Sequence, residues 1–356
     1  MFLKNKKGFI LSLFIILIIL IFYVLEIKFK NLDYFISGDE EYYQNIFFEG
    51  KSHYYSLFSR IPSLTNFQEI PRILQILIFT FYSSKLINFK STLFLLVYAC
   101  ASSFFLIILI RDPFILLSVI ILLDFFANKR SLNILHYLLA IIIFNNIAFD
   151  IFCIFIFSIF VSIVIKYNNI KTYVLAALIS SIVLFIFIDN IIFLLNLNII
   201  EGARNDGNAI DLSLIGIIKA FITFYTGPGF LRLYYNEIYF IEFYPSTYIF
   251  SYLFYSILTY FCLTYFICKI NIINFFILIK QNLKFCISIL FSLFFSSVYI
   301  FSDSGSSGYR KRFIVLFLLI TSIYEHKNFL FNTNPNKINL FFVIVFLITV
   351  NIYSIM

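Results

Sequence analysis

The sequence has few of the residues on which soluble proteins and metal enzymes depend. Charged residues make up only 12% of its 356 positions, against about 25% in ordinary soluble domains. There is no tryptophan, and the three histidines are far apart in the sequence: His53, His136 and His326. So little charge argues against a soluble domain, and such scattered histidines argue against a metal site.

Cysteine patterns and nucleotide-binding motifs are also missing. The five cysteines lie within apolar runs and form no Cys-x-x-Cys pair, so we expect small buried side chains rather than disulfides at Cys100, Cys153, Cys262, Cys268 and Cys286. The chain has no P-loop, no dinucleotide-binding glycine pattern, no His-Glu-x-x-His and no Gly-x-Ser-x-Gly. These absences argue against an ATP-driven pump and a soluble-type hydrolase, and no cofactor is expected.

Long apolar runs dominate the chain instead. Hydrophobic residues make up 62% of it, and many runs reach the ~17–25 residues that a helix needs to cross a bilayer. The runs do not alternate as the strands of a membrane β-barrel would. The sequence therefore predicts an all-α polytopic integral membrane protein, a single domain over 1–356 with about eleven transmembrane helices at 8–26, 72–87, 92–110, 114–128, 131–148, 150–165, 172–198, 246–268, 285–301, 313–324 and 338–355.

Charge placement predicts the orientation of these helices. Most lysines and arginines lie at helix ends that alternation assigns to the cytoplasm, which explains the net charge of +8 without a nucleic-acid partner. The apolar run after Met1–Lys7 is too long for a usual signal peptide, so we expect a retained first helix with a cytoplasmic N-terminus. The outer segments are then 27–70, 199–245 and 302–312.

One stretch leaves the orientation open. Residues 212–225 are apolar but short, contain Lys219, and are followed by the break Gly227-Pro228-Gly229. We favour a re-entrant or juxtamembrane element near 212–245 over a full span. If 212–225 did cross the membrane, the segment 302–312 would lie in the cytoplasm.

An acidic cluster follows the first predicted helix. Asp39, Glu40 and Glu41 are adjacent, and Tyr42 and Tyr43 come directly after them. A carboxylate in a partly desolvated pocket can accept the proton of an attacking hydroxyl, and tyrosine rings can stack on a sugar. Asp39 is our first candidate for a catalytic base. The alternative is a solvated outer loop that binds nothing.

A basic cluster precedes a late helix. Arg310, Lys311 and Arg312 follow a Gly- and Ser-rich stretch, on the side of the membrane predicted to be outer. Arginine binds phosphate through a planar, permanently charged fork, so this cluster suits a phosphate or diphosphate. The alternatives are an inner loop or pairing with lipid headgroups.

The remaining polar candidates are weaker. Arg204 and Asp206 could contact a sugar or diphosphate, although a surface turn is the plainer interpretation. Gly227 marks either a re-entrant tip near the site or a simple turn. Asp124 and Asp189 lie within apolar runs, where carboxylates are functional candidates by default, but Asp124 is close to Lys129 and Arg130 and could pair there.

Three segments carry a resemblance to a family. The chain resembles bacterial membrane polymerases of surface polysaccharide (O-antigen polymerases of the Wzy type and EpsG-like proteins) and integral-membrane glycosyltransferases of the GT-C superfamily. The resemblance rests on Asp39-Glu40-Glu41-Tyr42 after the first helix, Thr226-Gly227-Pro228-Gly229-Phe230 after an aromatic stretch, and Gly308-Tyr309-Arg310-Lys311-Arg312-Phe313 before a late helix.

The resemblance implies an activity and its partners. It implies a GT-C-like helix bundle in the bacterial inner membrane that transfers a glycan from a polyprenyl-diphosphate carrier to a sugar hydroxyl at the outer face. Asp39 would match the acidic first-loop residue of GT-C enzymes, and Arg310 and Arg312 would match phosphate-contacting residues. Expected partners are the lipid bilayer, a flippase and a chain-length regulator. The alternatives are a transferase that adds one sugar from a polyprenyl-phosphate donor, and a transporter of lipid-linked oligosaccharides.

Overall fold

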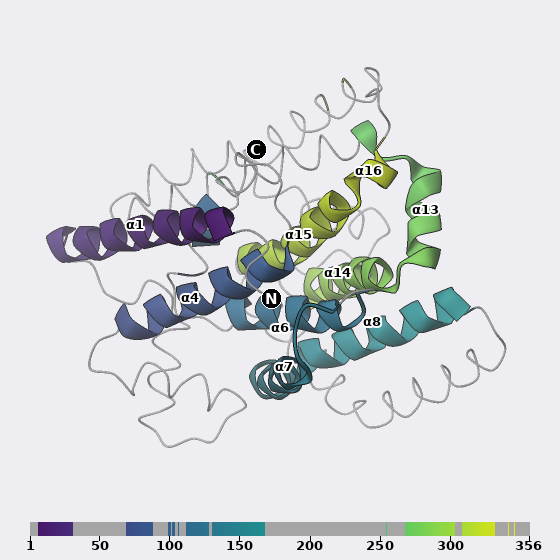
Figure 1. Cartoon of the computed structure of the whole chain (residues 1–356), viewed down its shortest axis with the longest axis horizontal. Helices are drawn as coiled ribbons and strands as arrows, with labels where there is room; N and C mark the ends of the chain where they lie inside the picture. Colours follow the sequence, from purple (N-terminus) through teal and green to yellow (C-terminus); the bar gives the residue numbers. More distant parts are fainter. Residues whose placement is uncertain are drawn as a thin grey trace, which may run out of the picture. The chain divides into compact units, whose positions relative to one another are not determined.

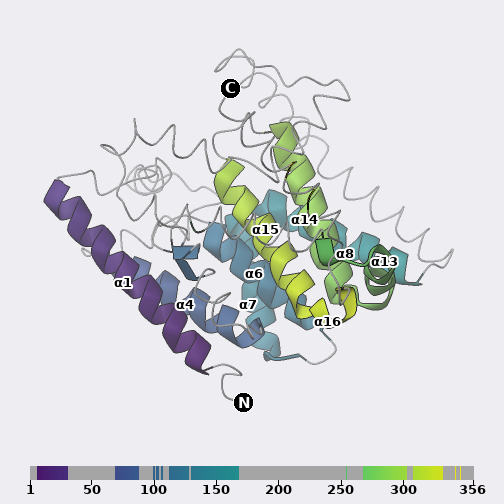
Figure 2. The same cartoon turned by 90° about the horizontal axis from the view of Figure 1, so that it is seen from above.

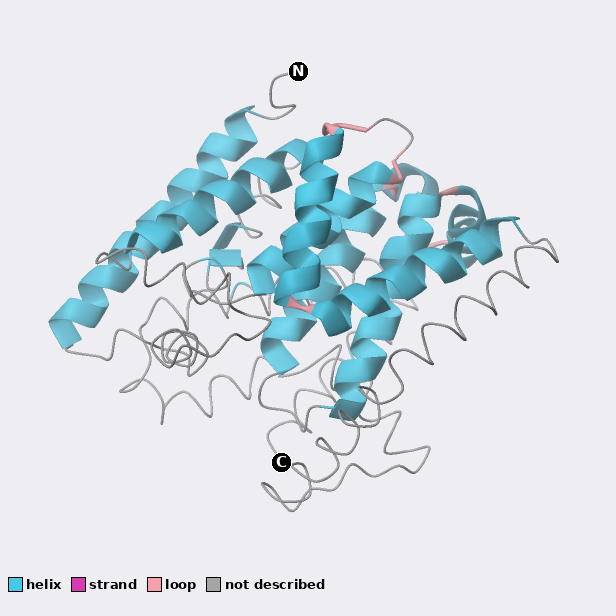
Figure 3. Cartoon of the chain, turned by 90° about the horizontal axis from the view of Figure 1, so that it is seen from below, coloured by secondary structure: helices cyan, strands magenta, loops and turns pink. Residues whose placement is uncertain are grey.

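The described part of the chain is helical. A computed structural model of the protein describes residues 6–30, 69–87, 99–100, 102–103, 106, 112–127, 130–167, 254, 268–302, 308–331, 341 and 345. Within these ranges there is no strand, only an isolated antiparallel bridge between Ile270 and Phe331 (Figure 3). The predicted all-α class is confirmed for this part of the protein. Its named helices are α1 (Lys6–Lys30), α4 (Glu69–Leu86), α6 (Asp112–Phe125), α7 (Ile134–Ile147), α8 (Phe149–Tyr167), α13 (Ile272–Gln281), α14 (Leu283–Ser302), α15 (Gly308–Glu325) and α16 (Lys327–Leu330).

Some of these helices are long and apolar enough to cross a membrane. Among the described residues, Phe9–Glu26 within α1 and Phe149–Tyr167 (α8) meet that condition. A third span results if α13 and α14, which meet at a sharp bend, count as one crossing, and Ile134–Ile147 (α7) is a shorter apolar helix. The protein is therefore a helical membrane protein.

The chain forms two compact units, described here one at a time. The first consists of residues 1–149, 229–268 and 336–356, and the second of residues 150–228 and 269–335. The prediction of one membrane domain over residues 1–356 stays a prediction.

In the first unit, α6 is the central helix. It packs against both α4 and α7, while α1 packs against α4 (Figures 1 and 2). Almost every residue of α6 is buried, as expected for a helix that is apolar on all sides. By contrast, α1 and α7 expose large apolar side chains such as Phe14, Phe22, Ile134 and Leu135. Such surfaces are stable against lipid but not against water.

In the second unit, α14 and α15 lie side by side (Figure 2). Aromatic rings connect α8 to α14, with the Phe155 and Phe291 centroids 5.5 Å apart. Buried serines lie between these helices, and most donate their hydroxyl to a carbonyl of their own helix, as Ser292 does to Ser288 O at 2.8 Å. Small side chains of this kind let membrane helices pack without unsatisfied polar groups. The fully buried serines on α8 and α14 are Ser158, Ser162, Ser288, Ser292 and Ser296.

The predicted helix positions hold within the described residues, but several boundaries differ. Helix α1 extends past the predicted 8–26 at both ends. Helix α4 begins at Glu69, before Pro71, because the first turn of a helix needs no N–H bond from proline. The predicted ranges 92–110 and 114–128 leave Asp112 and Pro113 between two helices, but both residues belong to the first turn of α6, where proline again needs no N–H bond.

Two further differences concern the second unit. The stretch 270–284 holds a helix of its own, α13, and the Leu283–Val298 segment of α14 is bent by 109° from it. The predicted loop at 302–312 is shorter than expected, since α15 already begins at Gly308 and its first turns include Arg310 and Arg312. The short helix α16 was not predicted.

Other predictions fall wholly or largely outside the described residues. These are the helices at 92–110, 172–198, 246–268 and 338–355, the first outer loop at 27–70, and the element near 212–245.

Candidate functional site

The acidic half of the predicted site lies outside the described residues. This holds for Asp39, Glu40, Glu41, Tyr42 and Tyr43. It also holds for three further candidates: Arg204, Asp206 and Gly227. That these residues meet the basic cluster in space stays a prediction.

The basic half is described, and it lies on a helix. The backbone of Arg310, Lys311 and Arg312 belongs to the start of α15. The Arg312 side chain is buried, with 6% of its surface exposed. Its neighbours in sequence, Phe313 and Ile314, are buried as well. The cluster therefore stands where a polar segment enters an apolar helix.

Electrostatics make this placement unusual. The N-terminal end of a helix carries a partial positive charge, so anions are favoured there and cations are not. The first turn of α15 contains no acidic residue but includes Arg310 and Lys311, and Arg312 comes next. The same partial charge would favour an anion bound at this end of the helix.

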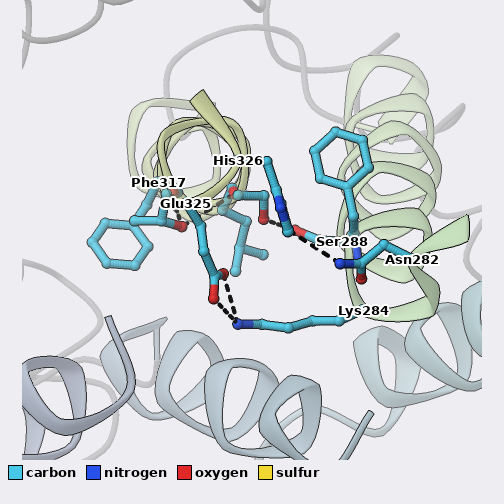
Figure 4. Close-up of polar contacts among 10 residues, drawn as sticks. Asn282, Lys284, Ser288, Phe317, Glu325 and His326 are labelled. Carbon is cyan, nitrogen blue, oxygen red and sulfur yellow. Dashed lines mark hydrogen bonds and ion pairs between the residues drawn. The ribbon is translucent and has the colours of Figure 1, made fainter. Parts of the chain in front are cut away.

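A second group of polar side chains connects the other end of α15 to the start of α14. We call it the α14–α15 polar cluster (Figure 4); it consists of Asn282, Lys284, Ser288, Ser322, Glu325 and His326. Lys284 Nζ lies 2.7 Å and 2.9 Å from the two carboxylate oxygens of Glu325. Deeper between the helices, the hydroxyls of Ser288 and Ser322 are 2.6 Å apart.

The contact between Asn282 and His326 fixes the state of the imidazole. Asn282 Oδ1 accepts the N–H of Phe285 at 3.0 Å, as a cap of α14, and this orients the side-chain amide. Its Nδ2, which can only donate, then lies 3.3 Å from His326 Nε2. Nε2 must accept this bond, so the proton of a neutral ring is on Nδ1.

The electrostatics of His326 agree with a neutral ring. Burial lowers the pKa of His326 below its ordinary value of 6.5. Glu325 acts in the opposite direction and Lys284 in the same direction, both more weakly. The cluster is a set of satisfied contacts that holds α14 to α15, and we assign it a structural role.

The buried carboxylate of Asp124 is also satisfied. Its Oδ2 accepts the hydroxyl of Tyr137 and the N–H of Ser131, each at 2.8 Å. Arg130, which we considered as a partner, donates to the carbonyl of Phe125 at 3.2 Å and lies 4.0 Å above that ring. Asp124 therefore stabilises the junction between α6 and α7.

Sequence reasoning did not single out Arg72. Its side chain is fully buried in α4, and its guanidinium lies 5.6 Å from the Tyr23 ring centroid of α1. One turn on, Gln75 Nε2 donates to the carbonyl of Leu106 at 3.1 Å. An arginine at the start of a membrane helix usually reaches the headgroups, so only the packing of α1 on α4 reveals that this one is buried.

Metal ligation has no support in the described part of the chain. No group of three or more His, Cys, Asp or Glu side chains comes together there. Four of the cysteines lie in this part, and all are free thiols: Cys100, Cys153, Cys268 and Cys286.

Comparisons with known proteins leave the function open. Neither the known protein families nor the curated proteins include a match to this sequence, and no solved structure matches the fold.

Proposed function

We propose that this protein is a membrane glycosyltransferase that polymerises polyprenyl-diphosphate-linked oligosaccharide repeat units, as in O-antigen or capsular polysaccharide synthesis. The observation that carries the proposal is the basic start of α15. Arg310, Lys311 and Arg312 lie in the first turns of α15, the first turn has no acidic residue, and Arg312 is buried. A polyprenyl diphosphate has both the anionic group for these cations and an apolar isoprenoid chain for the adjoining apolar helices.

The remaining predicted residues would supply the chemistry. The carboxylate of Asp39 would accept the proton of the attacking sugar hydroxyl while that oxygen forms a bond to the anomeric carbon of the donor. The bond from this carbon to the diphosphate oxygen breaks, and the diphosphate leaves with the electron pair. Arg310 and Arg312 would stabilise the charge that develops on it. Such a direct displacement inverts the anomeric configuration.

The finer membrane arrangement is part of the same proposal. It requires a GT-C-like bundle of about eleven spans in the bacterial inner membrane, with the N-terminus in the cytoplasm. Asp39 and Arg310 would then face the outer side together, close to where a flippase delivers the lipid-linked substrate. The charge distribution supports this orientation, because the predicted inner loops carry most of the lysines.

Glycan profiling of a deletion strain tests the proposal. The strain should make glycans with at most one repeat unit, and the wild-type gene should restore long chains. Asp39→Asn and Arg310→Ala should fail to restore them at normal protein levels. Lys166→Ala serves as the matched control, because Lys166 is an exposed cation at the end of α8 and its loss should leave polymerisation intact.

Other outcomes of the same experiment point elsewhere. A truncated repeat unit in the deletion strain would indicate the transferase that adds a single sugar. Accumulation of lipid-linked repeat units on the cytoplasmic side would indicate a transporter. Normal long chains in the deletion strain would contradict all three functions.

A further inference from the structure

Helix α13 exposes a wide apolar face. Ile272, Ile273 and Phe276 have 68%, 71% and 60% of their surfaces exposed, and Ile277 continues the same face. The opposite face is anchored, since Leu278 is buried and Phe275 packs edge-on against Phe285 with centroids 5.5 Å apart. An apolar face of this kind on a fixed helix must be covered by something other than water.

The direction of α13 excludes a simple continuation of α14. The Leu283–Val298 segment of α14 is bent by 109° from α13, so the two helices are close to perpendicular (Figure 1). The bend occurs at Asn282, whose backbone leaves the helical conformation. If α14 runs across the bilayer, α13 runs along its surface.

Both ends of α13 are held in this position. At its start, Asn271 caps the helix and donates its own N–H to the carbonyl of Leu330 at 2.8 Å. Asn274 Nδ2 donates to the carbonyl of Phe329 at 2.8 Å. At its end, Asn282 connects it to α14 and contacts His326 at 3.3 Å. The perpendicular arrangement is thus built into the fold of the second unit.

The charges around α13 are nearly all positive. Four lysines belong to α13, its flanks and α16; among the described residues of these segments and of adjoining α15, the acidic group is Glu325, which pairs with Lys284 at 2.7 Å. Lys280 is exposed in the last turn of α13. An exposed apolar face that ends in Lys280, with further lysines beside the helix, resembles the pattern of helices that lie in an anionic lipid interface. The four lysines are Lys269, Lys280, Lys284 and Lys327.

We propose that α13 is an interfacial helix whose face of Ile272, Ile273 and Phe276 lies in the headgroup region of an anionic phospholipid leaflet, with Lys280 on the lipid phosphates. The leaflet is the one at which α14 begins, which the lysine distribution predicts to be cytoplasmic. This position of α13 does not depend on the reaction that the protein catalyses.

Tryptophan fluorescence can measure the depth of α13, because the chain has no tryptophan of its own. Phe276→Trp and Ile273→Trp would each give a single-tryptophan protein, and both positions are exposed, so the fold should tolerate them. In nanodiscs, lipids brominated near the headgroup should quench these tryptophans more strongly than lipids brominated near the chain ends. Phe14→Trp, within the candidate span Phe9–Glu26, is the deep control and should show the opposite order.

Two outcomes would overturn the proposal. If lipids brominated near the chain ends quenched these tryptophans most strongly, as expected for Phe14→Trp, α13 would enter the hydrocarbon core as half of a broken span or as a re-entrant loop. If no brominated lipid quenched these tryptophans, the face would be covered by water where their emission is red-shifted, or by a protein partner where it is blue-shifted.

The choice of anionic lipid has its own test. Replacing phosphatidylcholine by phosphatidylglycerol in the nanodisc should raise the melting temperature of the wild-type protein. Lys280→Glu should remove roughly two-thirds of this rise, because it lowers the net charge of the four lysines and Glu325 from +3 to +1. Lys166→Glu, at the exposed end of α8, should remove a smaller part of the rise in melting temperature. A wild-type melting temperature that does not respond to phosphatidylglycerol would contradict the role of the lysines.

Discussion

At the scale of single residues, Asn282 decides the protonation state of a histidine. Its carbonyl oxygen is used to cap α14, which leaves only its NH2 group to face His326 Nε2 at 3.3 Å. A protonated imidazole would place an N–H donor against this NH2 group and break the contact. The lowered pKa of His326 and the geometry of Asn282 therefore favour the same neutral ring.

This contact predicts how stability depends on pH. The folded-state pKa of His326 is below its unfolded value of 6.5, so the unfolded chain binds the proton more readily. The stabilisation from the neutral ring is fully present above pH about 6.5 and is lost as the pH falls towards the folded-state value. Thermal unfolding in detergent should show a melting temperature that decreases from about pH 8 to about pH 5.5, and His326→Gln should decrease less.

The value near pH 8 is the internal control, because His326 is neutral there in both the folded and the unfolded chain. The charged groups that act on the ring are Glu325 and Lys284. Equal pH slopes in the wild-type protein and His326→Gln would contradict the prediction.

Single residues also show how far the sequence can predict a site. Arg310, Lys311 and Arg312 stand out in the sequence because three cations interrupt apolar runs. Arg72 does not stand out, because its burial depends on the Tyr23 ring of another helix. The sequence shows which residues adjoin Arg72 along the chain, but it does not show which side chains of other helices pack against it.

At the scale of elements, the junction between α6 and α7 depends on one carboxylate. Asp124 accepts from Tyr137 and from Ser131 N, each at 2.8 Å, and thereby satisfies a free N–H ahead of α7. Tyr137→Phe removes one of these bonds and should lower the free energy of unfolding by about 1–2 kcal/mol. The measurement is thermal unfolding of the purified protein in detergent.

Tyr167→Phe is the matched control for that substitution. Tyr167 is exposed at the end of α8, so removing its hydroxyl should leave the melting temperature unchanged. If both variants melt at the wild-type temperature, the bond between Tyr137 and Asp124 does not stabilise the junction.

Helix positions were predictable where the chain is uniformly apolar, as in α1 and α6. Boundaries were not, because polar residues can be either in a loop or in a first turn. Asp112 and Pro113 belong to α6, and Gly308 belongs to α15, although all three suit a loop equally well by residue type. The sequence did predict the start of a span at 285, close to the start of α14, but the position in which α13 is held depends on contacts of Asn271 and Asn282 with distant residues, which the sequence pattern does not contain.

At the scale of the whole molecule, the orientation of the helices decides whether the proposed site can work. The basic start of α15 must face the outer side, and the α14–α15 polar cluster must then face the cytoplasm, because they lie at opposite ends of α15. This arrangement follows from the lysine distribution only if residues 212–225 do not cross the membrane.

A split fluorescent protein tests the orientation in the full chain. The short fragment would be inserted after residue 306, between α14 and α15, or after residue 333, and the large fragment would be expressed in the cytoplasm. We expect fluorescence from the insertion after residue 333 and none from the insertion after residue 306. The same fragment added before Met1 is the positive control, since the N-terminus is expected in the cytoplasm.

The reverse pattern would have a definite meaning. It would place Arg310 and Arg312 in the cytoplasm, show that residues 212–225 cross the membrane, and contradict transfer at the outer face. The depth of α13 would be unaffected, although its leaflet would change.

The bend at Asn282 also bears on how the protein enters the membrane during synthesis. Without the bend, residues 272–302 would form one apolar helix that is much longer than the ~20 residues that a span needs. Several different stretches of this helix could then be inserted as the membrane span. A membrane span centred on the bend would put Lys280 and Lys284 in the hydrocarbon core, at a cost of roughly 5 kcal/mol. We therefore expect the polar break between α13 and α14 to determine which residue of α14 enters the bilayer first, and with it which residues of α15 lie within the bilayer.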